Sequence, residues 1–204
     1  MTAKQKGRIF LNYRRVDSEA YAGRIYDRLA PYFGDDAIFM DVDDIPAGVN
    51  FVKFLEDQVQ SCDVLIALIG RQWLNVKDKY GKRRLDNPQD FVRIEIVAAL
   101  KRDIRVIPVL LGGAQYPQET ELPENLQPLV LRSGLPINHH SFHTDVDRLI
   151  KHLEDALEDA ENSRVLKAKH LQEELEKRQR QTEIENYLLQ ANTAISLDDW
   201  RLAQ

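Results

Sequence analysis

The run Val64-Leu-Ile-Ala-Leu-Ile69 is uninterrupted and apolar, and it constrains the fold more than any other segment of the chain. A short run of β-branched and leucine side chains is typical of a parallel strand that is buried on both faces of a sheet. Parallel strands need long crossover connections, usually helices, and these helices cover the faces of the sheet. The run therefore predicts an α/β domain.

Other short apolar segments alternate with segments of helical spacing along the first three quarters of the chain. This alternation predicts a mostly parallel sheet with right-handed crossovers. Pro108 lies inside one expected strand and indicates an irregular or edge-like ladder there. The expected strands are 8–13, 38–40, 64–69, 104–111 and a short one within 136–142, and the expected helices are 18–32, 49–61, one that begins at Asn87-Pro88, and 145–157.

The composition changes near Glu158, where Glu, Lys, Arg and Gln become dominant and glycine and proline become rare. This pattern predicts a long charged helix and a candidate coiled coil, although its heptads are poor. Residues 192–204 are interpreted as a turn followed by the start of another helix. We therefore expect one domain over 1–157 and a helical extension over 158–204, which packs on a partner or leads into a further segment.

Composition argues against several classes of protein. The formal net charge of −5 gives no basic surplus for binding nucleic acid. The single cysteine, Cys62, rules out an internal disulfide, suits a reducing compartment and precedes an apolar strand, so we expect it in the core. Metal-ligand spacing is absent, and no apolar run is long enough to span a bilayer. These features predict a cytoplasmic protein without a metal, a nucleic-acid partner or a membrane anchor.

Polar residues follow two of the expected strands at the point where each strand ends. Ile9–Arg15 ends in a polar and basic exit, and Ile38–Gly48 runs into an acidic loop. In open α/β sheets, ligands bind at the carboxyl ends of the strands, so these exits frame a candidate site. Asp41, Asp43 and Asp44 could hold Mg²⁺, as in phosphoacceptor proteins, or form an acidic loop that shapes the cleft or contacts a neighbouring subunit. We prefer the acidic loop.

Glu95 lies in an otherwise apolar helical stretch, where a carboxylate is costly unless it faces a cleft or a partner. Phe91 precedes it by four residues, so both lie on one face of the helix. The ring of Phe91 could pack beside a ligand or belong to the core. Glu95 could also be a solvated residue that pairs with Lys101 or Arg102.

Four motifs resemble those of TIR (Toll/interleukin-1 receptor) domains, particularly bacterial ones. They are Phe10–Arg15, Phe39–Gly48, Phe91–Leu100 and Val106–Gly113, in the order of the family and within residues 7–155. The resemblance implies a flavodoxin-like fold with a five-stranded parallel sheet flanked by helices. It also implies a self-associating signalling module, and many members cleave NAD⁺ at the nicotinamide–ribose bond. The catalytic residue of the family is a glutamate on the helix before the fourth strand, which corresponds to Glu95.

The resemblance and the strand exits together give a set of expected substrate-binding residues. Arg14 or Arg15 could meet the diphosphate as a bidentate donor, or both could solvate a strand end. Trp73 could stack on adenine or anchor the polar stretch 71–90. Asn12 stands where the family often has serine, so we expect altered contacts. The full set is Phe10, Asn12, Tyr13, Arg14, Asp44, Trp73 and Phe91.

The expected function is an NAD⁺ glycohydrolase in defence or signalling that releases ADP-ribose or a cyclic variant. NAD⁺ is its substrate rather than a cofactor, and homotypic contacts, in a homo-oligomer or filament, switch it on. One carboxylate suffices, because nicotinamide leaves as a neutral molecule and needs no acid. The alternative is a non-catalytic TIR–TIR adaptor. A phosphoacceptor receiver domain is disfavoured, because the third strand ends in Ile69-Gly70-Arg71 rather than in an aspartate.

Overall fold

The computed structural model describes residues 7–40, 59 and 61–202 of the 204-residue chain. The chain divides into two units, residues 1–160 and 161–204. The first unit contains a five-stranded sheet in the order β2-β1-β3-β4-β5, in which every neighbouring pair is parallel. The strands are β1 (Ile9–Asn12), β2 (Ile38–Met40), β3 (Val64–Ile69), β4 (Arg105–Leu111) and β5 (Leu135–Ile137).

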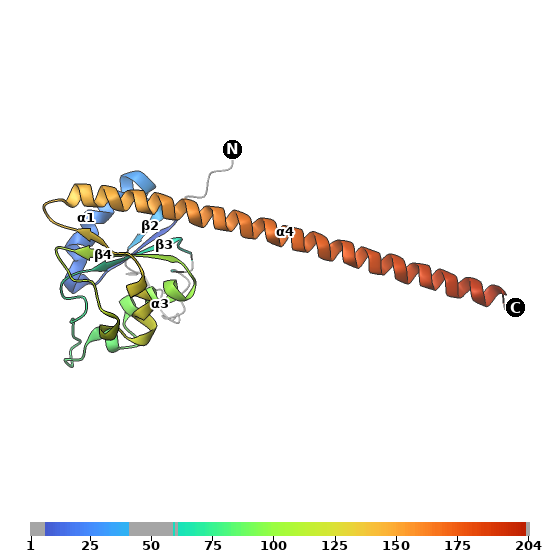
Figure 1. Cartoon of the computed structure of the whole chain (residues 1–204), viewed down its shortest axis with the longest axis horizontal. Coiled ribbons are helices and arrows are strands. Elements are labelled where there is room, and N and C mark those ends of the chain that lie inside the picture. Colours follow the sequence, from blue (N-terminus) through green and yellow to red (C-terminus); the bar gives the residue numbers. More distant parts are fainter. Residues whose placement is uncertain (1–6, 41–58, 60, 203–204) are drawn as a thin grey trace. The chain divides into compact units, whose positions relative to one another are not determined.

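Helices cover both faces of this sheet (Figure 1). Helix α1 (Arg15–Phe33) and the first turns of α4 (Phe142–Leu202) pack on one face, and α3 (Phe91–Lys101) packs on the other with the 3₁₀ helix η4 (Glu124–Leu131). Strand β3 is fully buried, and its side chains alternate between the two apolar clusters on the opposite faces. The predicted flavodoxin-like architecture, with a central strand covered on both faces, is confirmed.

Two helices begin at other residues than the sequence indicated. Helix α1 begins at Arg15 rather than at residue 18, so Asp17 lies inside its first turn. There the Asp17 carboxylate accepts the backbone N–H groups of Gly70 and Gln72, at 3.0 and 2.8 Å. Helix α3 begins at Phe91 rather than near Asn87, because Asp90 caps it by accepting the Arg93 N–H.

Strand β4 is an interior strand between β3 and β5. Its ladder is nevertheless locally irregular at Pro108, as the sequence indicated. Pro108 pairs in register with Ala67 of β3. The pairing of β4 with β5 begins only at Val109. At position 108, the described β4 is therefore paired with β3 only. An interior strand can tolerate proline, which has no N–H, where it needs hydrogen bonds on one side only.

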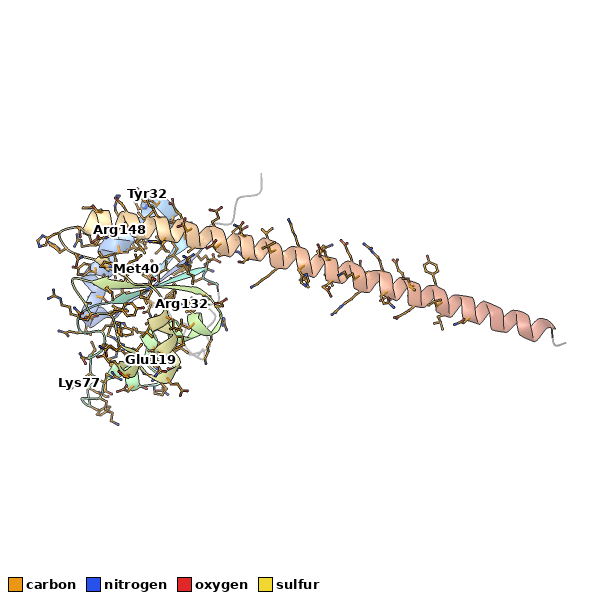
Figure 2. The ribbon with its side chains drawn as sticks, viewed as in Figure 1. Tyr32, Met40, Lys77, Glu119, Arg132 and Arg148 are labelled. Carbon is orange, nitrogen blue, oxygen red and sulfur yellow. The ribbon has the colours of Figure 1, made fainter. Side chains whose placement is uncertain are left out.

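Helix α4 continues without interruption from Phe142 to Leu202, so the predicted turn near residue 192 was wrong. The sequence contains no glycine or proline from residue 142 to its last residue, and nothing there stops the helical hydrogen-bond ladder. Almost all side chains over 161–189 are exposed and project from both sides of the ribbon (Figure 2). The coiled coil stays a prediction, and most of the expected helix 49–61 lies outside the described residues.

A pair of glycine substitutions tests the contact between α1 and the end of β3. A Cβ on Gly70 would overlap the Asp17 carboxylate, whereas a Cβ on Gly23 of α1 meets nothing within 4 Å. We expect Gly70→Ala to lower the free energy of unfolding by about 1–3 kcal/mol, as overpacking does. Gly23→Ala should raise it by about 0.5–1 kcal/mol, since alanine favours the helix. Urea denaturation measures both, and equal effects of the two changes would contradict this account.

Cys62 is a buried core residue, as its position before β3 indicated. Burial raises the pKa of its thiol from 9.0 to about 11. At pH 8 this rise lowers the thiolate population about a hundredfold, because a rise of one pKa unit lowers that population about tenfold. We expect alkylation by iodoacetamide in the native protein to be at least that much slower than in denaturant. Mass spectrometry measures the extent of alkylation over time. Equal rates in both solvents would show that the thiol is accessible.

Candidate functional site

The end of β1 meets helix α3 at the carboxyl edge of the sheet. Asn12, the last residue of β1, is buried, and its Nδ2 donates to Oε2 of Glu95 at 2.6 Å. The same nitrogen lies 3.3 Å from the carbonyl oxygen of Val92. Glu95 itself is only 8% exposed. A neutral amide thus orients the Glu95 carboxylate.

The other polar atom of the Asn12 side chain is an unused acceptor. Oδ1 of Asn12 is buried and has no hydrogen-bond partner among the described residues. Buried polar atoms are nearly always hydrogen-bonded, so such an atom at the edge of a sheet calls for a donor from a ligand or from water.

An ion pair joins the segment after β1 to the start of α3, a few residues from Asn12 and Glu95. Arg14 donates through both terminal nitrogens to the two carboxylate oxygens of Asp90, each at 2.9 Å, and both side chains are 1% exposed. Arg84 adds a third bond, from Nε to Oδ2 of Asp90 at 3.0 Å. Asp90 also caps α3 through the Arg93 N–H. The pair therefore fixes the start of the helix that carries Glu95 against the exit of β1.

This geometry changes the interpretation of Arg14. The sequence suggested that Arg14 could bind a diphosphate, but the terminal nitrogens of its guanidinium are engaged by Asp90. We therefore treat Arg14 as a residue that positions α3. Sequence reasoning missed Asp90 and Arg84. An aspartate directly before an apolar helical stretch is a helix-cap signal that could have identified Asp90, whereas nothing local marked Arg84.

The remaining predicted residues divide into core and surface. Phe10 and Trp73 are almost completely buried in the cluster beneath α3, so Trp73 anchors its loop, and we leave both out of the proposed site. Tyr13 is half-buried, and Phe91, in the first turn of α3, is 48% exposed. Asp44, with the neighbouring Asp41 and Asp43, lies outside the described residues. In the described part of the chain, no three His, Cys, Asp or Glu side chains are grouped to hold a metal.

The arrangement has a simple chemical capacity. A buried carboxylate, held by an amide at the carboxyl edge of a parallel sheet, can stabilise positive charge that develops on a bound ligand. A preorganised carboxylate stabilises such charge at little reorganisation cost, and low local polarity strengthens the interaction.

None of the described helices is long and apolar enough to cross a membrane.

Comparison with known proteins agrees with this architecture. A family model described as a TIR domain matches residues 9–150, which is more than half of the chain. A similar solved structure is the one titled as the activated Roq1 resistosome directly recognizing the pathogen effector XopQ, in its TIR domains. The TM-score is 0.51 at 13% identity, and the match covers 72% of this chain and 99% of that chain. The structural likeness shows the shared fold, and with the match to the family model it establishes that the chain belongs to the TIR domain family.

Proposed function

We propose that this TIR domain cleaves NAD⁺ at the bond between nicotinamide and ribose, with Glu95 as the catalytic carboxylate. The observation that carries the proposal is the buried Glu95 carboxylate, which Asn12 holds at 2.6 Å at the exit of β1. The family resemblance of the motif around Glu95 supports the same assignment. NAD⁺ is the substrate here, and the proposed reaction uses no further cofactor and no metal.

The chemistry needs one carboxylate. When the C–N bond breaks, its electron pair moves to the pyridinium nitrogen, and nicotinamide leaves as a neutral molecule without a proton. Positive charge then develops on the ribose ring, and Glu95 stabilises it electrostatically. Oδ1 of Asn12 is available to accept a ribose hydroxyl. Water then adds to the ribose carbon and loses a proton to give ADP-ribose, or a group of the same molecule adds and gives a cyclic variant.

Self-association is the proposed switch for this activity. The related TIR domains described above were solved in an assembly named a resistosome. The Phe91 side chain, which lies four residues before Glu95 on α3, is 48% exposed, so a neighbouring subunit could cover it and exclude water from the site. We place the protein in cytoplasmic defence or signalling, with homotypic TIR contacts in a homo-oligomer or filament as its active form.

Release of nicotinamide tests the function. The purified chain is incubated with NAD⁺ at several protein concentrations, with and without a crowding agent, and free nicotinamide is followed by chromatography. We expect the rate per protein molecule to rise with concentration, because assembly completes the site. A constant rate per molecule would contradict activation by assembly. The absence of release under all these conditions would favour the non-catalytic TIR–TIR adaptor.

A further inference from the structure

A cavity lies at the carboxyl edge of the sheet, and Glu95 does not line it. Its volume is about 510 Å³, and the exits of β3, β4 and β5 line it together with the first turns of α1. Asn12, Phe91 and Glu95 are not among its lining residues. Ligands of open α/β sheets bind at the carboxyl ends of strands, and this volume falls in the usual range of small-molecule sites.

The exposed residue Arg71 lines this cavity, and a hydrogen bond holds its guanidinium group. Nε of Arg71 donates to the carbonyl oxygen of Gly112 at 2.7 Å, which holds the side chain against the end of β4. The terminal nitrogens of Arg71 have no hydrogen bond to another described residue, so they remain free to bind an anion. Gly112 and Gly113 both have positive φ values, 58° and 79°. A Cβ built on Gly113 would lie 3.6 Å from a terminal nitrogen of Arg71, at ordinary van der Waals distance, so Gly113 lies next to the guanidinium group.

The segment after β5 also lines the cavity and supplies donors. One terminal nitrogen of Arg24 lies 3.4 Å from Nδ1 of His139, and arginine can only donate, so Nδ1 accepts. The proton of the neutral His139 ring is therefore on Nε2, which is left as a donor. Arg24 itself is fixed by the Phe142 ring, whose centroid is 3.8 Å from its guanidinium carbon. Asn138 and His140, from the same segment after β5, also line the cavity.

The cavity also contains one carboxylate, which is already engaged. Asp17 accepts the backbone N–H groups of Gly70 and Gln72, one on each oxygen. These two bonds hold the Asp17 carboxylate against the segment that directly follows β3. The polar side chains left for a ligand can all donate: the Arg71 guanidinium, the two imidazoles, the Tyr21 hydroxyl and the Gln72 and Asn138 amides.

We propose that this cavity binds a small molecule that carries a phosphate group and has about the size of a mononucleotide. Arg71 binds the phosphate oxygens through its terminal nitrogens, the geometry that arginine uses for phosphate. His139 and His140 add donors from the segment after β5. The proposal does not depend on cleavage of NAD⁺, because it uses none of the residues assigned to that reaction.

Calorimetric titration with AMP tests the site, with adenosine and inorganic phosphate as companion probes. We expect saturable binding of AMP by the full chain and at least tenfold weaker binding of adenosine, which lacks the phosphate. Saturable binding of inorganic phosphate would support the same site with the phosphate as its main determinant. In NMR spectra of the imidazole carbons, AMP should shift the signals of His139 and His140. The variants His139→Gln and His140→Gln assign these signals.

Matched variants locate the binding. Arg71→Gln should weaken AMP binding at least tenfold, and Arg180→Gln, which removes an exposed arginine of α4 outside this cavity, should leave it within twofold of wild type. Glu95→Gln should also bind AMP normally. No saturable AMP binding, or equal binding by the Arg71 and Arg180 variants, would overturn the proposal. Loss of binding in Glu95→Gln would overturn it too, because AMP would then occupy the Glu95 site.

Discussion

Glu95→Gln is expected to lower the rate of nicotinamide release about a thousandfold and to leave the fold intact. Glutamine has the same shape, and its side-chain oxygen can still accept the Asn12 N–H that Glu95 now accepts at 2.6 Å. What the variant loses is the negative charge that, in the proposed reaction, stabilises the developing ribose cation. Removal of one preorganised electrostatic group typically costs a factor of 10²–10³ in rate. The measurement is the initial rate of nicotinamide release at saturating NAD⁺.

The stability of this variant separates catalysis from folding. A buried carboxylate is costly, so its neutral replacement should leave the free energy of unfolding unchanged or raise it slightly. Glu19→Gln removes a carboxylate from an exposed position of α1 and should retain full activity. If Glu95→Gln keeps more than a tenth of the wild-type rate, Glu95 is not the catalytic carboxylate. If the variant is inactive because it is unfolded, the denaturation curve shows it.

The largest expected effect on stability comes from Asp90→Ala. The change leaves Arg14 buried without its carboxylate, and breaking such a pair typically costs about 3–5 kcal/mol. It also removes the cap of α3, which is worth about 1 kcal/mol. Since a domain of this size is stable by about 5–15 kcal/mol, Asp90→Ala should be close to unfolding. Urea denaturation followed by circular dichroism measures the loss.

Related variants separate the contributions of the ion pair and the cap. Asp90→Asn keeps a good helix cap and should therefore be more stable than Asp90→Ala by about 1 kcal/mol. Arg14→Met should cost less than Asp90→Ala, because Asp90 keeps its bond to Arg84 at 3.0 Å. Arg28→Ala is the matched control, since Arg28 pairs with Asp147 at 2.8 Å on the surface, where ion pairs contribute at most about 1 kcal/mol. Equal losses for Arg14→Met and Arg28→Ala would contradict a stabilising role of the buried pair.

Much of the fold could be predicted because strands and helices are encoded by local periodicity. The run Val64–Ile69 predicted a strand covered on both faces, and the segments around it predicted the alternation of strands with helices. The same local signals located Glu95, since a carboxylate within an apolar helical face is unusual wherever the helix packs. The boundaries were less exact, because the starts of α1 and α3 depend on side chains that cap or contact them from other segments.

The pairing of side chains was decided by the tertiary structure. Asn12 and Glu95 are far apart in the sequence, as are Arg14 and Asp90, and no local pattern links them. Both pairs form because the sheet order places β1 in the interior, with α3 packed against its end. The same packing buries Trp73 and engages Arg14, two side chains that the sequence alone left open to a ligand. Periodicity determined which segments are strands and helices, and three-dimensional packing determined which polar side chains face one another.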